Sequence, residues 1–374
     1  MARAVHPPSI ATLIARAAVS NTIVVTLTDR YALPFAYNWA HHLHIAGVQG
    51  VLVGLMGIPH GTAPFAEVSR RLRPLGASAY AVENSANGMR LQRTAASTVR
   101  QGSRWFHVLP LLRTGCRVLL SDADVVWLRD PRSYLVALEA AHPRMDFAVS
   151  TDSEWPTDRR RLIAAASSPD RRGDLDLEAF SACSASMNIG ILHFPPGARP
   201  GALRAVAEMV THLSGNLNRV DQGQVNYRWK RGADHWRWQR TLHAVREDAD
   251  LSVGAAGKRA RGTSRVARLC GLVNGSVVAG VLPLAQFGNT LTQTVLQLHR
   301  TVGVEPFALH ATWMRSQEPE YKIWRLREAV AWLDPPSWYT GERAGGERGG
   351  ERGGERAGEG ESRRGCDVKS RSGS

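Results

Sequence analysis

Two aspartates one residue apart, Asp122 and Asp124, are the side chains in this sequence best suited to metal chemistry. They follow the apolar run RVLLS, which predicts a buried strand, and precede a second apolar run, VVWL. Alternate residues of an extended chain face the same side, so both carboxylates can bind one divalent cation and leave room for phosphate oxygens. Because two crowded acids are unfavourable without a cation, the pair indicates a metal site rather than a polar strand end that only begins a turn.

An Asp-x-Asp motif behind an apolar strand is typical of two enzyme classes. In haloacid-dehalogenase phosphatases the first Asp is a nucleophile, and in nucleotide-sugar transferases the pair binds manganese. The phosphatases carry the motif near the start of the chain and need a later acidic pair after another apolar strand. Here the motif begins at residue 122, and the later candidate, GDLDLE, follows the hydrophilic run SSPDRR. A transferase is therefore favoured, and a phosphohydrolase is the first alternative.

The charge balance suggests a second alternative. A net charge of +14 and a pI near 10.4 favour polyanionic partners such as phosphates, nucleic acid or acidic glycans. Residues 257–268 carry five basic side chains and no acid, and residues 229–240 mix aromatic with basic side chains. Neither stretch belongs to a recognisable nucleic-acid-binding module, so a nucleic-acid partner is not favoured.

Composition sets further limits. With 374 residues, of which 43% are hydrophobic, the chain can bury a substantial core, which excludes disorder of the whole chain. Its apolar runs are all shorter than the roughly 20 residues of a membrane helix, and no anchor or signal is visible. Four cysteines without a CxxC pair exclude a zinc ribbon and leave four free thiols or one disulfide.

Strands and helices are expected to alternate along the chain. Short β-branched or apolar runs predict strands at residues 21–27, 51–55, around Tyr80, and at 117–122 and 147–150. Apolar side chains at helical spacing predict helices at 33–46, 65–72 and 95–113. This order predicts an α/β fold with a mostly parallel central sheet flanked by helices, and such a sheet binds ligands outside the carboxyl ends of its strands.

Six blocks of sequence make a family resemblance specific. The chain resembles the nucleotide-diphospho-sugar transferases of glycosyltransferase family 77, which include plant and green-algal arabinosyltransferases acting on hydroxyproline-rich glycoproteins. The resemblance runs from about residue 19 to 339, and its last block is most similar to the extensin arabinosyltransferase branch. The blocks are VVTLTDRYALPFAYNWAHHL, LLSDADVVWLRDP, SMNIGILHF, VDQGQVNYRW, VLPLAQFGN and ALHATWMRSQEPEYKIWRLREAVAWLDPPSWY. The resemblance implies a Rossmann-like fold of the GT-A type.

The resemblance also implies roles at the donor sugar. In SMNIGILHF, Asn188 would bond sugar hydroxyls and Gly190 would permit close backbone approach, although Asn188 can also be an ordinary polar residue of a core strand. In DQGQVN, Asp221 and Gln222 would face the donor. Asp221 would stabilise positive charge on an oxocarbenium-like carbon, or else only cap a helix.

Other residues would hold the cation, the phosphates and the nucleotide. The resemblance implies that His310 is the third metal ligand and that Lys322 meets the diphosphate, with Arg325 and Arg327 nearby. Relatives often read KRHRLREA where this chain reads KIWRLREA, so a broad basic clamp is not expected. Thr26 and Asp29 close the first strand, where uracil and ribose usually bind, and Arg104 is a further phosphate contact or a solvated charge.

Taken together, these features predict a metal-dependent retaining glycosyltransferase. The expected cofactor is Mn²⁺ or Mg²⁺, the donor a UDP-sugar, and the acceptor a hydroxyproline-rich glycoprotein or glycan. The sugar, arabinose, and the Golgi location rest on the resemblance alone. The transferase domain is expected at 19–340, after a lead-in at 1–18, with loop insertions at about 156–182 and 249–279. Residues 341–374 form a Gly-Glu-Arg repeat that predicts a disordered tail.

Overall fold

The computed structural model describes most of the expected transferase domain. Its described residues are 21–82, 98–152, 186–214, 222–223, 225, 244–245, 269–272, 276–312 and 318–334, together with Thr12 and Ile14. Met1–Trp332 form one compact unit and Leu333–Ser374 a separate one. The expected insertion at 156–182 and the tail at 341–374 lie outside the described residues, as does the lead-in at 1–18 apart from Thr12 and Ile14.

The first part of the chain alternates strands with helices. Its elements are β1 (Thr22–Asp29), α2 (Leu33–Ile45), β2 (Val51–Met56), α3 (Ala63–Leu72), the 3₁₀-helix η1 (Arg73–Leu75), β3 (Ala77–Val82), α4 (Thr98–Arg113) and β4 (Arg117–Ser121). Local sequence explains their ends: Thr62 caps α3 by accepting a hydrogen bond from the amide of Phe65, and Gly47, in the left-handed region, follows α2. The expected strand–helix order is therefore confirmed up to β4.

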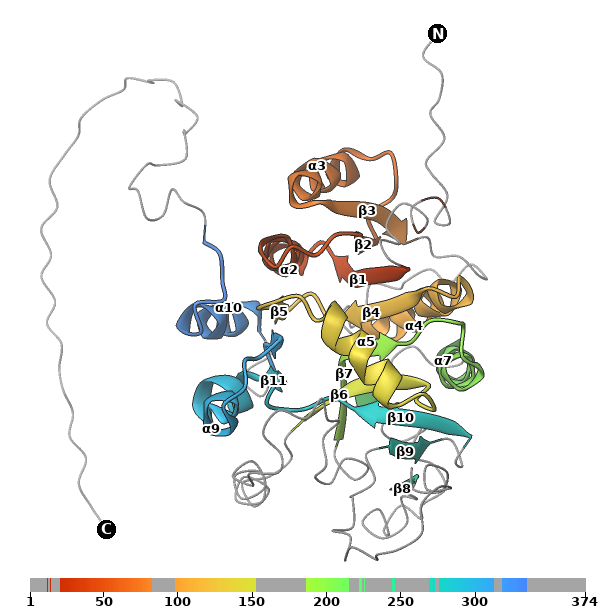
Figure 1. Cartoon of the computed structure of the whole chain (residues 1–374). Helices are drawn as coiled ribbons and strands as arrows, with labels where there is room; N and C mark the ends of the chain where they lie inside the picture. The colour runs from red at the N-terminus through yellow and green to blue at the C-terminus, as the bar shows by residue number, and fades with distance from the viewer. Residues whose placement is uncertain are drawn as a thin grey trace, which may run out of the picture. The chain divides into compact units, whose positions relative to one another are not determined.

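The central sheet continues beyond β4. Its further elements are α5 (Arg132–Ala141), β6 (Phe147–Asp152), β7 (Ser186–Phe194), α7 (Pro200–Ser214), β8 (Ala244–Val245), β9 (Leu269–Leu272) and β10 (Val277–Val281). The strand order is β3-β2-β1-β4-β7-β6-β10-β9-β8, visible from top to bottom in Figure 1. Within this described sheet, β7 and β9 run opposite to the other seven strands. The expected α/β fold with a mostly parallel sheet flanked by helices is confirmed.

A second, three-stranded sheet stands beside the first. Its strands, in the order β11-β12-β5, are β11 (Phe287–Asn289), β12 (Ala308–His310) and β5 (Val125–Trp127). The π-helix η3 (Leu291–Val295) and α9 (Leu298–Val302) connect β11 to β12, and α10 (Pro319–Glu328) follows. Antiparallel pairing sets His310 opposite Val125, which directly follows Asp124. The small sheet thus brings the C-terminal part of the chain to the aspartate pair.

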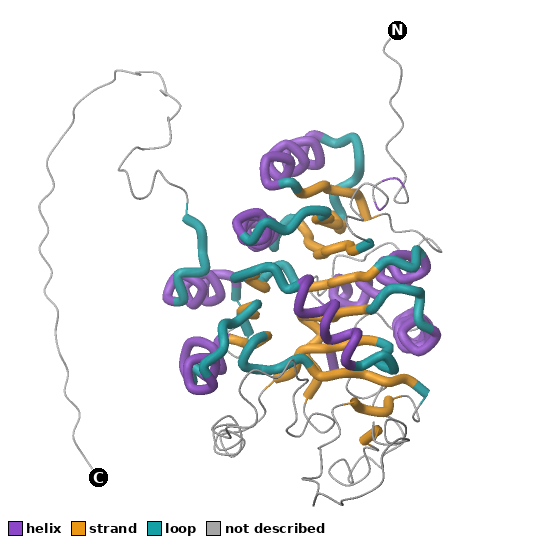
Figure 2. Tube along the Cα trace, in the orientation of Figure 1, coloured by secondary structure: helices purple, strands orange, loops and turns teal. Residues whose placement is uncertain are grey.

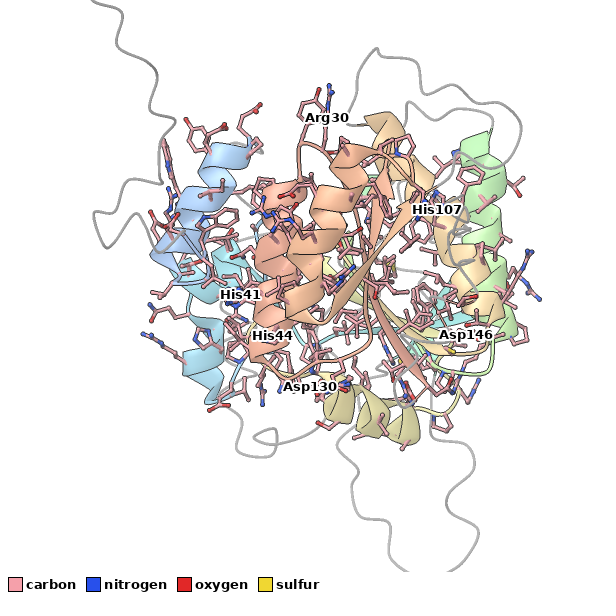
Figure 3. The ribbon with its side chains drawn as sticks, turned by 90° about the horizontal axis from the view of Figure 1, so that it is seen from above. Arg30, His41, His44, His107, Asp130 and Asp146 are labelled. Carbon is pink, nitrogen blue, oxygen red and sulfur yellow. The ribbon has the colours of Figure 1, made fainter. Side chains whose placement is uncertain are left out.

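Helices cover both faces of the central sheet, as Figure 2 shows. Alternate residues of the central strands belong to different cores: Val24 of β1 packs with α2, α3 and α5, whereas Ile23 and Val25 pack with α4 and α7. Seen from above in Figure 3, His41 and His44 of α2 lie on one side of the strands and His107 of α4 on the other. The architecture is therefore a three-layer sandwich.

One expected boundary is wrong. The loop insertion expected at 249–279 contains β9 and the start of β10, which pair antiparallel in the central sheet. Gly271 and Gly280 interrupt these apolar runs, so their strand pattern is weak in the sequence. Residues 249–268 of that stretch lie outside the described residues.

A partly buried ion pair fixes the amino end of β4. Arg117 donates to both carboxylate oxygens of Glu139 on α5, at 2.6 and 2.7 Å, and to the hydroxyl of Thr22 on β1 at 3.0 Å. Nε2 of the fully buried His193, on β7, lies 2.8 Å from the same carboxylate. Burial alone would raise the pKa of Glu139, but the hydrogen bonds from Arg117 and His193 lower it to about 2. We call Arg117, Glu139 and His193 the basal cluster.

Candidate metal and donor site

The aspartate pair lies in a tight turn at the carboxyl end of β4. β4 ends at Ser121 and β5 begins at Val125, whose amide donates to the carbonyl of Asp122 at 3.2 Å. The two residues are therefore not in the extended i, i+2 arrangement that the sequence suggested. A turn was not evident because apolar residues continue on both sides of it, and the carboxylates meet through the fold of the turn instead.

Four hydrogen bonds hold this turn in place. The amide of Asp122 donates to the carbonyl of Gly190 at 2.8 Å, and the carbonyl of Asp124 accepts from the amide of Ala311 at 3.1 Å. The hydroxyl of Ser121 accepts hydrogen bonds from two fully buried indoles, Trp39 of α2 at 2.8 Å and Trp127 of β5 at 3.3 Å. Since α2, β5, β7 and β12 all contribute, the turn is built into the core rather than left as a surface loop.

His310 completes a three-residue cluster with the aspartates. Its Nε2 lies 3.3 Å from a carboxylate oxygen of Asp124 and 3.7 Å from one of Asp122. One possible ligand atom from each residue lies within 4.8 Å of the others. Burial would lower the pKa of His310, but Asp124 and Asp122 outweigh it and raise the pKa. The structure therefore brings together the three residues that were expected to bind a metal.

Two cations lie against the outer oxygens of the pair. Nζ of Lys322, on α10, is 2.5 Å from Asp124, and Nη1 of Arg104, on α4, is 2.6 Å from Asp122. Burial alone would raise the pKa of Asp124, but Lys322 and His310 hold it well below its usual range. Burial would likewise lower the pKa of Lys322, and Asp124 outweighs it and raises the pKa. Both basic residues expected at the phosphates therefore contact the metal-binding carboxylates directly.

The position of Lys322 is set by the anchoring of α10. Leu326, one turn along the helix, is fully buried in the core that contains α2. Beyond the helix end, the carbonyl of Ala331 accepts from Asn38 at 3.0 Å and lies 3.1 Å from Nε2 of His42, both on α2. Arg325, by contrast, is exposed and pairs with Glu328 of its own helix at 2.5 Å. Lys322 is thus the basic residue of α10 that contacts the aspartates.

The three ligand candidates suit a divalent cation. Nε2 of His310 is buried, and within the described part of the chain it has no hydrogen-bond partner of acceptable geometry. An imidazole nitrogen facing two carboxylates is a donor set that Mn²⁺ or Mg²⁺ can use, and a buried nitrogen without a partner is otherwise costly. The residues therefore fit a bound divalent metal.

A second polar cluster, unforeseen in part, lies at the same edge of the sheet. Asp152 ends β6. Its carboxylate accepts hydrogen bonds from the side-chain amide of Asn188 at 2.7 Å and from the side-chain amide of Gln222 at 3.1 Å. The oxygen of the Asn188 side chain accepts from the amide of Gly190 at 2.8 Å. A register shift between Val149 and Ser150 accompanies this irregular pairing of β6 with β7. Asp152 was missed, although an acid at the carboxyl end of a buried strand, FAVSTD, is the signal that drew attention to Asp122.

The remaining expected residues have mixed outcomes. Asp221 lies outside the described residues. Asp29 accepts hydrogen bonds from the amides of Tyr31 at 2.8 Å and Ala32 at 3.1 Å, which gives it a structural role before α2. Thr26 is fully buried, and in the described part of the chain its hydroxyl has no partner. Nucleotide contacts by Thr26 and Asp29 stay predictions.

Comparisons with known proteins place the chain in a family. The family model for nucleotide-diphospho-sugar transferases matches residues 84–326. Arabinosyltransferase XEG113 of Arabidopsis thaliana is 26% identical over 329 residues, which is 85% of this chain and 41% of that protein. The chain therefore spans about two fifths of the length of this curated relative. Both the described site and most of the described fold fall within the matched range.

Solved glycosyltransferases are more distant. GlyE of Streptococcus pneumoniae TIGR4 shares 10% identity with a TM-score of 0.40, over 85% of this chain and 63% of that one. Galactosyltransferase LgtC, solved with donor and acceptor sugar analogues, shares 13% identity with a TM-score of 0.38, over 86% of this chain and 99% of that one.

Proposed function

Because the chain belongs to the nucleotide-diphospho-sugar transferase family, we propose that it is a metal-dependent, retaining glycosyltransferase. It would transfer a sugar from a UDP-sugar to a glycoprotein or glycan acceptor. The observation that carries this proposal is the convergence of Asp122, Asp124 and His310 within 4.8 Å, beside Lys322 and Arg104. Acids, an imidazole and two strong cations at one site suit a substrate that carries a diphosphate.

Asp122, Asp124 and His310 would hold the cation. Mn²⁺ or Mg²⁺, when bound, neutralises negative charge on diphosphate oxygens. Asp124 is ionised at neutral pH because Lys322 and His310 keep its pKa low, so it can accept a cation without first losing a proton. His310 offers an sp² nitrogen fixed in direction by burial, since only 4% of the residue is exposed.

Lys322 and Arg104 would change partners during the cycle. In the chain alone they neutralise Asp124 and Asp122, at 2.5 and 2.6 Å. When the carboxylates bind a cation, each basic side chain loses much of its attraction to them and can turn to the diphosphate. Lys322 is the better leaving-group partner, since an ammonium on a flexible stem can follow the departing phosphate. Its contact would strengthen as the bond between the anomeric carbon and the diphosphate oxygen breaks, and so would accelerate the reaction.

Asp152, Asn188 and Gln222 would form the sugar side of the site. Asn188 and Gln222 both donate to Asp152, which keeps its carboxylate in place at the carboxyl end of β6. Asp221, adjacent to Gln222 in sequence, is proposed to lie near the sugar carbon and stabilise positive charge there. Retention of anomeric configuration is proposed from the family resemblance, with the acceptor attacking from the face that the diphosphate leaves.

The transferred sugar is proposed to be arabinose. The support is the arabinosyltransferase of Arabidopsis thaliana, which is 26% identical over 85% of this chain. A hydroxyproline-rich acceptor and a Golgi location are proposed on the same family resemblance. Among the described residues, no helix is both long and apolar enough to cross a membrane.

A donor panel tests the proposal. UDP-arabinofuranose, UDP-arabinopyranose, UDP-galactose and UDP-xylose would each be incubated with the protein and Mn²⁺, with and without hydroxyproline peptides. We expect UDP release and sugar transfer from an arabinose donor, loss of both with a chelator, and a product of retained configuration by NMR. Phosphate release from small esters without sugar transfer, or a product of inverted configuration, would refute the proposal.

A further inference from the structure

Gly190 occupies a position where no side chain fits. A Cβ atom built there would overlap Cε1 of His310 and lie 2.5 Å from its Nδ1 and 2.8 Å from its Nε2. Gly190 is not among the glycines with positive φ, so its backbone conformation does not require glycine. The need for glycine at this position of β7 is therefore a need for space, and the space is filled by the imidazole ring.

We propose that Gly190 is a positioning residue of the cation site: its bare α-carbon seats the His310 ring, and its carbonyl holds Asp122. The inference rests on the proposed metal dependence. It gives Gly190 a task different from the expected close approach to the donor sugar. Two of the three ligand candidates, one from β12 and one from the turn after β4, are thus aligned by a single residue of a third strand.

Neither side of this contact can move away easily. The amide of Gly190 donates to Asn188 at 2.8 Å and its carbonyl accepts from Asp122 at 2.8 Å, so both polar groups of the residue are held. His310 is 4% exposed, and its strand pairs with β5 on one side and β11 on the other. A methyl group at position 190 would therefore displace the ring, and with it the nitrogen that faces Asp122 and Asp124.

A double-mutant cycle tests the proposed positioning of the His310 ring by Gly190. Gly190→Ala, His310→Ala and the double variant would be titrated with Mn²⁺ by calorimetry, using the full chain without donor, and their melting temperatures recorded. We expect Gly190→Ala to weaken Mn²⁺ binding about 10- to 100-fold, the range for residues that orient metal ligands. In the His310→Ala background the ring is gone, so the same substitution should change neither affinity nor melting temperature further.

Gly54→Ala is the matched control. A Cβ at Gly54 would lie 2.7 Å from the hydroxyl oxygen of Tyr80 and overlap Leu27, in a strand that contributes none of the ligand candidates. This variant should melt at a lower temperature but bind Mn²⁺ as the unmodified chain does. If Gly54→Ala weakens Mn²⁺ binding as much as Gly190→Ala does, the effect at Gly190 is general destabilisation and the proposal is wrong.

The other possible results of these measurements also test the proposal. The proposed positioning of His310 by Gly190 is wrong if Gly190→Ala binds Mn²⁺ with normal affinity. It is also wrong if the losses of Mn²⁺ affinity caused by the two single substitutions add in the double variant. If Gly190→Ala alone fails to fold, the double variant decides: a folded double variant supports the steric contact, and an unfolded one refutes it. If the unmodified chain binds no Mn²⁺, the proposed metal dependence fails. The melting temperatures of the cycle still test the contact between Gly190 and His310 in that case.

Discussion

Each end of β4 carries a cluster of acidic, basic and histidine side chains. The two clusters differ in how fully their polar atoms are hydrogen-bonded. At the amino end, the basal cluster combines Arg117, Glu139 and His193 around one carboxylate, whose two oxygens accept three hydrogen bonds. At the carboxyl end, two carboxylates face His310, whose Nε2 lies 3.3 and 3.7 Å from them without a well-formed hydrogen bond among the described residues. Both carboxylate oxygens of the basal cluster are hydrogen-bonded, although Nδ1 of His193 has no partner among the described residues, whereas Nε2 of His310 faces two carboxylates without a well-formed hydrogen bond.

The two clusters therefore have different roles: the basal cluster contributes to stability, and the cluster at the carboxyl end serves function. A partly buried ion pair contributes to the fold, and breaking it leaves a charge without compensation. A site that must bind a cation and a diphosphate needs oxygens and a nitrogen that the fold does not consume. Substitutions at the basal cluster should therefore change stability with little effect on turnover, and substitutions at the other end should do the reverse.

Asp124→Asn should have the largest effect on activity. It removes a metal-binding charge, so transfer should fall on the order of 10³-fold, the upper range for lost electrostatic stabilisation. Asp122 still attracts Lys322 in this variant, so the melting temperature should fall by less than in a variant that strips a cation of every carboxylate. Steady-state transfer assays and thermal melts of the same preparation check both. Near-normal turnover of this variant in the presence of a chelator would contradict the assignment.

Glu139→Gln is the complementary substitution at the basal cluster. It leaves the Arg117 charge without its ion pair, which should cost on the order of 3 kcal/mol in the free energy of unfolding. Denaturant melts measure the loss. Turnover per folded molecule should equal that of the unmodified chain, because Glu139 lies at the opposite end of β4 from the aspartate turn. A proportionate fall in turnover would show that the two ends are coupled.

Lys322→Met should lower turnover and raise the affinity for Mn²⁺. Turnover should fall on the order of 10²-fold, more than donor affinity falls, since the contact is strongest as the bond breaks. Mn²⁺ affinity of the chain without donor should rise several-fold, because Asp124 no longer has to exchange an ammonium for the metal. Arg325→Met, on the exposed side of the same helix, should alter neither. Weaker Mn²⁺ binding in Lys322→Met would refute the exchange of partners.

The smallest expected effect is on the pH dependence of stability. Burial lowers the pKa of His193 from 6.5, and the pKa of Glu139 falls from 4.5 to about 2. In both cases the unfolded chain binds protons more readily, so the free energy of unfolding should decline below about pH 6.5 and more steeply from 4.5 towards 2. The Glu139 contribution should be about 2 kcal/mol after allowance for solvent screening. Melts of metal-free protein would measure it, and Glu139→Gln should reduce the steeper part by that amount and leave the contribution of Asp124, whose pKa is also lowered.

Local patterns were sufficient to predict much of the fold. Runs such as NTIVVTL and VLVGL are short, apolar and β-branched, and the helices between them carry apolar side chains at helical spacing, so β1, α2 and β2 could be located from neighbouring residues alone. The metal candidates were also recoverable, Asp122 and Asp124 from their position after an apolar strand and His310 through the family resemblance.

What escaped prediction depends on contacts between distant parts of the chain. Lys322 and Asp124 are 198 positions apart, and nothing local indicates that the lysine neutralises the aspartate. The cost expected from crowding the two acids is offset in part by Lys322 and Arg104, which lie 2.5 and 2.6 Å from them. The basal cluster and the contact between Gly190 and His310 could not be predicted either, because each is assembled from three separate elements.

The two indoles on Ser121 make the aspartate turn observable by spectroscopy. Trp39 and Trp127 donate to one hydroxyl, and that hydroxyl belongs to the residue immediately before Asp122. The ¹⁵N–¹H resonance of each indole depends on the length and strength of its own hydrogen bond to this common acceptor. Any rearrangement of the turn on cation or donor binding will therefore shift two resonances together. The native chain thus contains a paired reporter, with no attached probe, beside its proposed metal ligands.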